Sequence, residues 1–127
     1  WEAIQVTGEG KTWEQWKREL VKIAPVWDFS GYNSITTQPI NDVMENYTDN
    51  SHYTEKVGNL VLNRIFSYQL DQVPDDFGVL ITPENIDNHL KKINQKRKQW
   101  LENNQNEEQL VKTLKRNFDQ QQKSKSE

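Results

Sequence analysis

Apolar residues recur at helical spacing in three stretches of this chain, and each stretch predicts a helix with one apolar face. The first begins at Thr12, a residue able to cap a helix, and ends before Pro25. We expect its tryptophans to be core residues rather than a platform that stacks on sugars. The stripe consists of Trp13, Trp16, Leu20 and Ile23.

A second helix is predicted from Thr54, with a broad buried face. Gly58 lies near its start, and a glycine inside a helix costs about 1 kcal/mol relative to alanine. Either a backbone or loop packs closely there, or the cost is simply tolerated. The apolar face consists of Val57, Leu60, Val61, Leu62, Ile65, Phe66 and Leu70.

The third helix is predicted to start at Thr82-Pro83-Glu84, which combines a capping hydroxyl, a first-turn proline and an acid. His89 lies within it, and we expect a half-buried or surface residue. Amides at 103–106 weaken the pattern, and we expect the polar end at 120–127 to fray. The apolar positions are Ile86, Leu90, Ile93, Trp100 and Leu101, followed by Leu110, Val111, Leu114 and Phe118.

Two shorter apolar segments predict extended structure. Residues 26–29 are predicted to form a strand. Residues 77–81 are predicted to form either a strand or a buried extended segment that leads into the next helix. A long polar loop over 31–53 separates the first strand from the second helix, and long ordered loops are often functional. Its apolar residues Ile35, Ile40, Val43 and Met44 could attach it to a core.

Composition narrows the class of protein. The 127 residues are 33% hydrophobic with a mean hydropathy of -1.02, which indicates one small domain with a modest core. A net charge of -3 argues against a nucleic-acid binder. The absence of cysteine excludes disulfides, thiolate catalysis and thiolate zinc sites. No apolar run is long enough to cross a bilayer, and the start at Trp1 leads us to expect a processed product or an excised fragment.

The candidate chemistry lies in the loop, where Asp49 precedes His52 by three residues. A carboxylate that fixes an imidazole, which then takes a proton from a serine, is the arrangement of a serine hydrolase. Alternatively, Asp49 caps a turn and His52 is an ordinary loop side chain. No second histidine lies at ligand spacing, so we expect no metal and no cofactor. None of the serines that we considered has the setting of a nucleophile: Ser30, Ser34, Ser51 and Ser67.

The order of the strand at 26–29, Asp49-x-x-His52, and Gly58 in an aliphatic helix resembles the last conserved block of SGNH-type (GDSL-like) hydrolases. The strings at 47–53 and 57–62 look like bacterial SGNH-like proteins associated with cell-surface polysaccharides. The resemblance covers roughly residues 12–101, although only the Asp-x-x-His block carries chemical meaning.

This resemblance implies an α/β fold, the carboxyl-terminal part of a three-layer α/β/α sandwich with a parallel sheet, over residues 1–102. Residues 103–127 would be a polar helical tail. His52 would be the general base and Asp49 the residue that orients it, while the nucleophilic serine and the oxyanion donors belong to earlier blocks. The parent would be an extracytoplasmic or membrane-anchored esterase or O-acyltransferase acting on an ester or acylated glycan. This chain alone would be inactive.

The alternative is a small helical interaction module in which residues 83–122 form one long helix that pairs with another chain. Self-association could use that helix or an exposed sheet edge. A parallel pairing of the strand at 26–29, together with a hydrogen bond between Asp49 and His52, would favour the hydrolase. An exposed apolar stripe on the carboxyl-terminal helix would favour the module.

Overall fold

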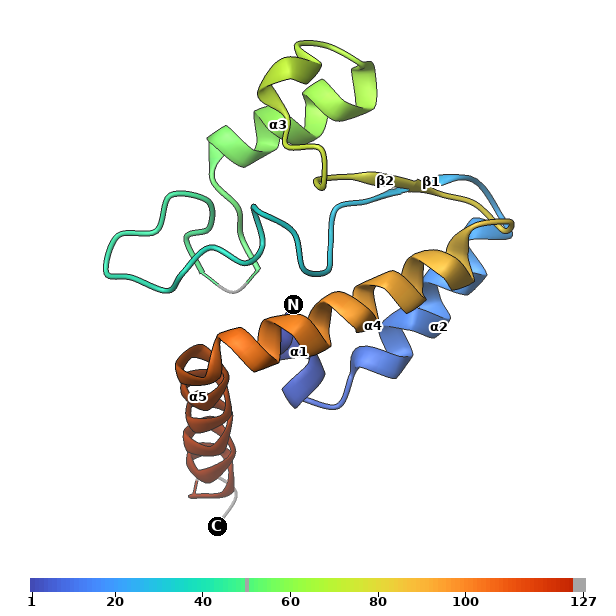
Figure 1. Ribbon diagram of the computed structural model, residues 1–127. Coiled ribbons are helices and arrows are strands. Elements are labelled where there is room, and N and C mark those ends of the chain that lie inside the picture. The colour runs from blue at the N-terminus through green and yellow to red at the C-terminus, as the bar shows by residue number, and fades with distance from the viewer. Residues whose placement is uncertain (50, 125–127) are drawn as a thin grey trace.

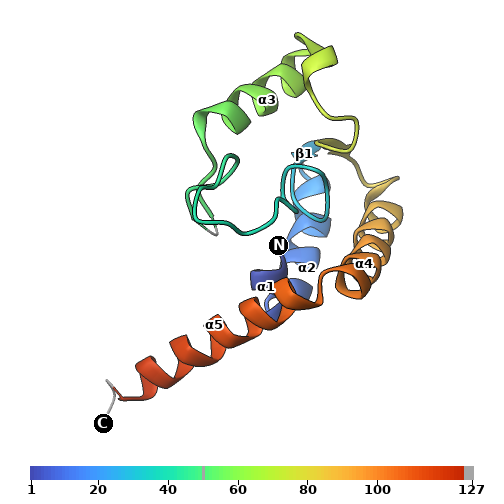
Figure 2. The ribbon, with the colours of Figure 1, turned by 60° about the vertical axis from the view of Figure 1, so that its left-hand side comes forward.

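The computed structural model describes residues 1–49 and 51–124, and it is a mixed α/β structure that is 57% helix. Helices cover one face of a small two-stranded sheet and another helix lies beyond one end of it, while the last helix projects from the rest of the molecule (Figures 1 and 2). In chain order the elements are α1 (Glu2–Val6), α2 (Gly10–Val21), β1 (Val26–Asp28), α3 (Glu55–Phe66), the 3-10 turn η1 (Leu70–Gln72), β2 (Val79–Ile81), α4 (Ile86–Asn103) and α5 (Gln105–Ser124).

Both predicted extended segments are strands, but β1 and β2 pair antiparallel. The parallel sheet that the SGNH resemblance implies is therefore wrong for the described residues. The register explains the pairing, because it sets Val26 directly opposite Ile81 and both residues contact the same apolar cluster. Pairing in this direction buries the fully enclosed Ile81 beneath the sheet while Leu80 stays exposed.

The first core lies between the sheet, α2 and α4. The predicted apolar positions Ile86, Leu90 and Ile93 of α4 are buried there, and Trp100 packs against them, as expected. The predicted burial of Trp13 and Trp16 is wrong, since their side chains are 37% and 50% exposed. The two rings contact each other edge to face at 5.2 Å. Helix α2 is turned so that Lys17 and Val21 face inward.

The second core joins the long loop to α3 and to the segment before β2. Its buried members are Ile35, Val57, Val73 and Phe77. Only the first half of the predicted α3 face is covered, because Leu62, Ile65, Phe66 and Leu70 are exposed. A Cβ at Gly58 would lie 3.4 Å from the Tyr53 ring, which is an ordinary van der Waals contact, so packing does not require glycine there and its cost is tolerated.

Several predicted boundaries and anchors differ from the structure. Helix α2 begins two residues before Thr12, which is exposed, and α4 begins at Ile86 after a turn over 82–85. In the long loop Ile35 is buried, as proposed, whereas Ile40 and Val43 are exposed. Polar side chains hold the loop instead: the Asn33 amide oxygen accepts from two backbone N–H groups, and the buried Asn46 amide donates to the Ile35 carbonyl.

The stretch over 83–122 is two helices rather than one. Asn104 leaves helical geometry (φ -132°, ψ 50°), and its amide donates back to the Trp100 carbonyl, which ends α4. Helix α5 then packs against α1 and is helical as far as Ser124, while residues 125–127 of the expected frayed end lie outside the described part. In the part of the chain that the structure describes, no helix is both long and apolar enough to span a membrane.

Candidate functional site

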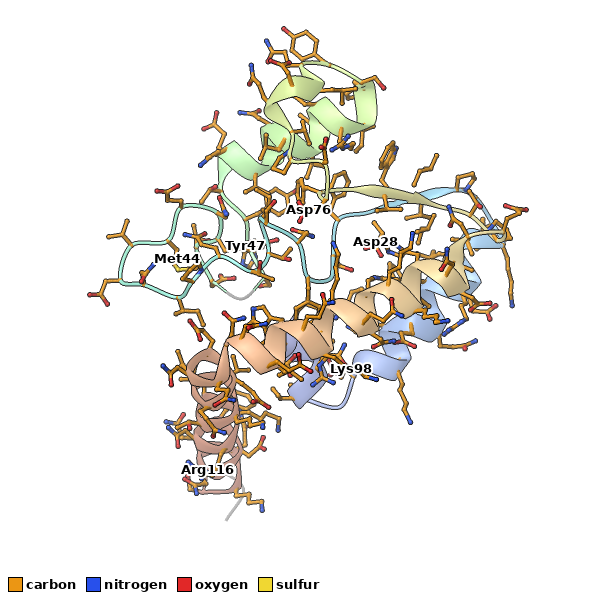
Figure 3. The ribbon with its side chains drawn as sticks, in the orientation of Figure 1. Asp28, Met44, Tyr47, Asp76, Lys98 and Arg116 are labelled. Atoms are coloured by element: carbon orange, nitrogen blue, oxygen red, sulfur yellow. The ribbon has the colours of Figure 1, made fainter. Side chains whose placement is uncertain are left out.

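Asp49 and His52 lie on a tight turn of the long loop, immediately before α3. Tyr47 and Tyr53 form an isolated antiparallel bridge at its base, and Figure 3 labels Tyr47 there. The Thr48 N–H and hydroxyl both donate to the His52 carbonyl, at 2.9 and 3.1 Å. The backbone thus fixes both ends of the turn, so the two candidate side chains are brought together by local structure alone.

The two carboxylate oxygens of Asp49 accept hydrogen bonds from different groups. Oδ1 accepts from the backbone N–H groups of Ser51 and His52, both at 2.7 Å, and from the Ser51 hydroxyl at 3.0 Å. Oδ2 accepts from Nδ1 of His52 at 2.7 Å. The bonds from the Ser51 and His52 backbone, and then the imidazole bond, hold the pKa of Asp49 well below its usual range. Asp49 therefore caps a turn and orients a histidine at once.

This hydrogen bond fixes which nitrogen of His52 can act as a base. An ionised Asp49 can only accept, so Nδ1 carries the proton and Nε2 of the neutral ring has a lone pair. Within residues 1–49 and 51–124, no group is hydrogen-bonded to Nε2, and the side chain is 78% exposed. The geometry presents an oriented proton acceptor to whatever approaches from solvent.

No serine in the described part of the chain is placed on that acceptor nitrogen. The Ser51 hydroxyl lies 3.2 Å from Nδ1 of His52, which is the wrong nitrogen, and it donates to Asp49. The hydroxyl of Ser34 donates to Asp76. Within the described residues, the pair therefore has an orienting group and a base, and neither of these serine hydroxyls is placed as its nucleophile.

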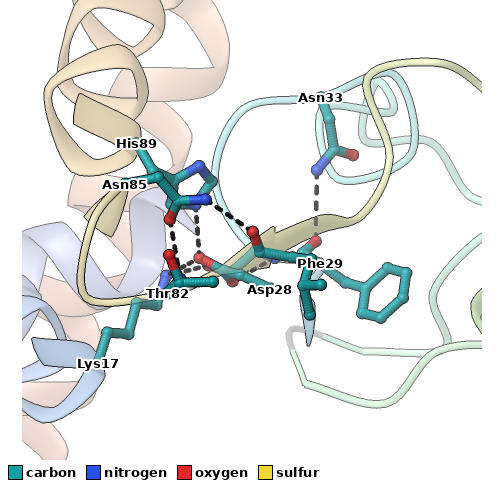
Figure 4. Close-up of polar contacts among 9 residues, drawn as sticks. Lys17, Asp28, Phe29, Asn33, Thr82, Asn85 and His89 are labelled. Atoms are coloured by element: carbon teal, nitrogen blue, oxygen red, sulfur yellow. Dashed lines mark hydrogen bonds and ion pairs between the residues drawn. The ribbon is translucent and has the colours of Figure 1, made fainter. Parts of the chain in front are cut away.

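A second cluster, absent from the sequence interpretation, centres on the buried Asp28 at the end of β1 (Figure 4). Oδ2 accepts from Nζ of Lys17 at 2.6 Å and from Nε2 of His89 at 2.8 Å. Oδ1 accepts from the hydroxyl and the N–H of Ser30 at 2.7 and 3.0 Å. The cluster joins α2, β1 and α4 through one carboxylate.

The chemistry of this cluster is structural. Burial by itself raises the pKa of Asp28, but the bonds from His89, Lys17 and Ser30 outweigh it, so the pKa lies well below its ordinary value. His89 uses Nε2 to donate, and Ser30 bonds to Asp28 rather than to the imidazole, so these residues do not form a nucleophile and base. His89 is nearly buried and holds α4 to β1.

A third polar cluster connects α1 to α4. The buried Glu2 of α1 accepts a two-pronged contact from Arg97 of α4, at 2.9 and 2.6 Å, and accepts from the Tyr32 hydroxyl. Burial opposes ionisation of Glu2, but the bonds from Arg97 and Tyr32 leave its pKa lowered. This pairing positions α1 against α4. The Glu2 carboxylate, the Arg97 guanidinium and the Tyr32 hydroxyl are bonded to one another, so the cluster does not offer an unpaired acid or base.

The sequence did contain a signal for the Asp28 cluster. A carboxylate at the end of the apolar run Val26-Trp27-Asp28 must find donors if the strand is buried, because an unpaired buried charge is costly. What it did not reveal was which donors, since Lys17 and His89 are 11 and 61 residues away. In the described residues, no group of three or more His, Asp or Glu side chains is arranged to hold a metal ion.

Comparison with protein-family models, with curated proteins and with solved structures found no match to this chain. The function must therefore be argued from the geometry of the Asp49 and His52 pair and from the motif that contains it.

Proposed function

We propose that Asp49 and His52 are the orienting acid and general base of a Ser-His-Asp system of the SGNH type. In this role Nε2 of His52 takes a proton from a serine that attacks an ester carbonyl, and Asp49 stabilises the imidazolium that results. The serine and the oxyanion donors would come from a segment outside residues 1–127. The substrate class is an ester, either hydrolysed or used as an acyl donor to a glycan.

The observation that carries this proposal is the 2.7 Å hydrogen bond between Nδ1 of His52 and Oδ2 of Asp49. Histidines beside carboxylates are common, but this carboxylate is itself fixed by two backbone N–H groups. The imidazole is therefore oriented before any substrate binds, which is the condition for efficient proton transfer. The exposed Nε2 side leaves room for a second segment that carries a serine.

The proposal includes a larger fold, in which the described elements are the carboxyl-terminal part of a three-layer α/β/α sandwich. The antiparallel pairing of β1 and β2 departs from the parallel sheet of that sandwich, so the proposal rests on the Asp49 and His52 pair and not on the sheet. The exposed apolar side chains of Leu62, Phe66 and Leu80 support it, because such surface is more often covered in a complete domain than left in water. Each strand of the two-stranded sheet also has one edge outside the ladder. Further strands could add there.

The test is an assay of the whole gene product with an activated acetyl ester, measured with and without a glycan acceptor. We expect His52→Ala to lower kcat by about 10³-fold or more, since a serine without its base is a poor nucleophile. Asp49→Asn, which leaves the ring unfixed, is expected to lower kcat by about 10²-fold or more.

Two controls keep the result interpretable. Tyr53→Phe changes the same turn without touching the pair, and we expect it to retain full activity. Residues 1–127 alone are expected to show no hydrolysis above background. Full activity in His52→Ala would remove the catalytic role, and hydrolysis by residues 1–127 alone would show that the nucleophile lies within this chain.

A further inference from the structure

Thr48 donates two hydrogen bonds to one acceptor, the backbone carbonyl of His52. Its N–H donates at 2.9 Å and its hydroxyl at 3.1 Å. The N–H of His52 itself donates to Oδ1 of Asp49 at 2.7 Å. Both peptide groups that flank the Cα of His52 are therefore hydrogen-bonded, and two of these three bonds come from Thr48.

The hydroxyl bond takes the place of a backbone bond that a regular ladder would have here. Tyr47 and Tyr53 form an antiparallel bridge, so Thr48 lies opposite His52 at the next position. Two residues opposed at a hydrogen-bonded position of an antiparallel ladder exchange two bonds from N–H to carbonyl. At this position Thr48 donates one of them, whereas the His52 N–H is occupied by Asp49. The Thr48 hydroxyl provides the second bond between the opposed residues.

We propose that Thr48 is a positioning residue for His52, because it fixes the backbone from which the imidazole projects. This inference rests on the proposed function, in which His52 is the general base. With the backbone held on both sides of the His52 Cα, only the two side-chain torsions of the imidazole stay variable, and the bond from Nδ1 to Oδ2 of Asp49 sets them. Each backbone bond therefore reduces the number of ring orientations that compete with the productive one. Thr48 acts through His52 and touches no reacting atom.

The role of the Thr48 hydroxyl can be separated from the role of its side-chain shape. Thr48 is exposed, so removing its hydroxyl creates no internal cavity and leaves no buried donor unpaired. Valine has the same β-branched shape and restricted χ1 torsion without the donor, whereas serine keeps the donor without the branch. Thr48→Val and Thr48→Ser therefore test the hydrogen bond and not the packing of the turn.

The first experiment is nitrogen-15 NMR of the imidazoles in residues 1–127, at a pH where both rings are neutral. A hydrogen bond between uncharged groups shifts an equilibrium by about 3- to 10-fold. We expect Thr48→Val to lower the ratio of the Nδ1-protonated to the Nε2-protonated tautomer of His52 by this factor, and Thr48→Ser to keep most of the wild-type ratio. A general loss of stability does not change this ratio while the protein stays folded, and urea denaturation measures that loss separately.

Thr54→Val is the matched control. The Thr54 hydroxyl also donates to a backbone carbonyl of this loop, that of Glu45 at 2.9 Å. It supports the same short ladder at its other end, so we expect this variant to leave the tautomer ratio of His52 unchanged. An equal fall of the ratio in Thr54→Val would show that the ladder as a whole orients the ring, which would overturn the specific role of Thr48.

The second experiment measures esterase kinetics of the whole gene product. Thr48→Val is expected to lower kcat by about 3- to 10-fold with little change in KM, because the hydroxyl orients a base and does not bind substrate. An unchanged tautomer ratio and an unchanged kcat in Thr48→Val would overturn the positioning role while the proposed function stands, as would equal losses in Thr48→Val and Thr48→Ser. A wild-type product without esterase activity, together with a lowered tautomer ratio in Thr48→Val, would overturn the proposed function while the orienting contact stands.

Discussion

Asp28 accepts bonds from Lys17 of α2, His89 of α4 and the neighbouring Ser30, and the ammonium of Lys17 depends on its negative charge. Removing that charge leaves the Lys17 ammonium, which is also buried, without a counterion. A buried charge that loses its partner typically costs about 3–5 kcal/mol. We therefore predict that Asp28→Asn lowers the free energy of unfolding by roughly this amount in urea denaturation at neutral pH.

The matched control for that variant is Asp87→Asn. Asp87 also pairs with a cation of α2, Arg18, at 2.9 Å, but its side chain is 81% exposed. Exposed ion pairs contribute at most about 1 kcal/mol. If the two variants lost similar amounts of stability, the Asp28 cluster would not be the main polar connection between β1 and the helices.

The lowered pKa of Asp28 also sets a pH dependence. A carboxyl group whose pKa is lower in the folded state contributes stability above its unfolded pKa of about 4, and this contribution is lost as pH falls toward the folded pKa. We predict that the free energy of unfolding decreases between about pH 5 and pH 2. The decrease should be smaller in Asp28→Asn, and an identical slope in both proteins would contradict this assignment.

At the level of elements, α3 carries a glycine that it does not need for backbone geometry. A methyl group at Gly58 would contact the Tyr53 ring at 3.4 Å, an ordinary van der Waals distance. Alanine is favoured over glycine inside helices by about 1 kcal/mol. Gly58→Ala is therefore expected to raise the free energy of unfolding by about 0.5–1 kcal/mol in urea denaturation.

Gly78, just before β2, gives the opposite expectation. Its φ of 89° favours glycine, and a Cβ there would lie 2.5 Å from Cε1 of Phe29 and 2.9 Å from Cγ of Arg64. We predict that Gly78→Ala lowers the free energy of unfolding by about 2–4 kcal/mol, from strain and overpacking together. A loss below that range would mean that the Phe29 ring moves aside easily.

Helical periodicity predicted that α2, α3 and α4 exist, because apolar residues at intervals of three and four are a local property of the chain. The periodicity was wrong about which side of α2 faces the core. The tryptophan stripe looked like the core side, but Lys17, which neighbours Trp13 on the helix surface, pairs with the buried Asp28. The helix is therefore rotated so that the side with Lys17 and Val21 faces inward. A pairing between distant residues overrode the local pattern.

The same distinction separates the two polar sites. Asp49 and His52 are three residues apart, so their spacing alone placed them within reach, and the turn that joins them is local. The cluster around Asp28 depends on how three elements meet, which no spacing encodes. The antiparallel register of β1 and β2 likewise follows from packing Val26 beside Ile81 in the first core.

In the whole molecule, the apolar interior is divided into two small cores, and the buried Asp28 and Glu2 clusters both connect elements around the first one. The first lies beneath the sheet between α2 and α4, and the second beneath α3. A large share of the apolar surface faces outward on α2, α3 and α5. Such a surface is more typical of a protein that assembles with other chains or domains than of an isolated one.

The two histidines of the chain offer a direct test of the oriented base. Because Asp49 bonds Nδ1 of His52 and Asp28 bonds Nε2 of His89, the two rings hold their protons on opposite nitrogens when neutral. Nitrogen-15 NMR of imidazole-labelled protein, recorded at a pH where both rings are neutral and assigned with His89→Gln, distinguishes these tautomers. We expect protonated Nδ1 and bare Nε2 for His52, the reverse for His89, and loss of the preference at His52 in Asp49→Asn. A proton on Nε2 of His52 would contradict its role as a base.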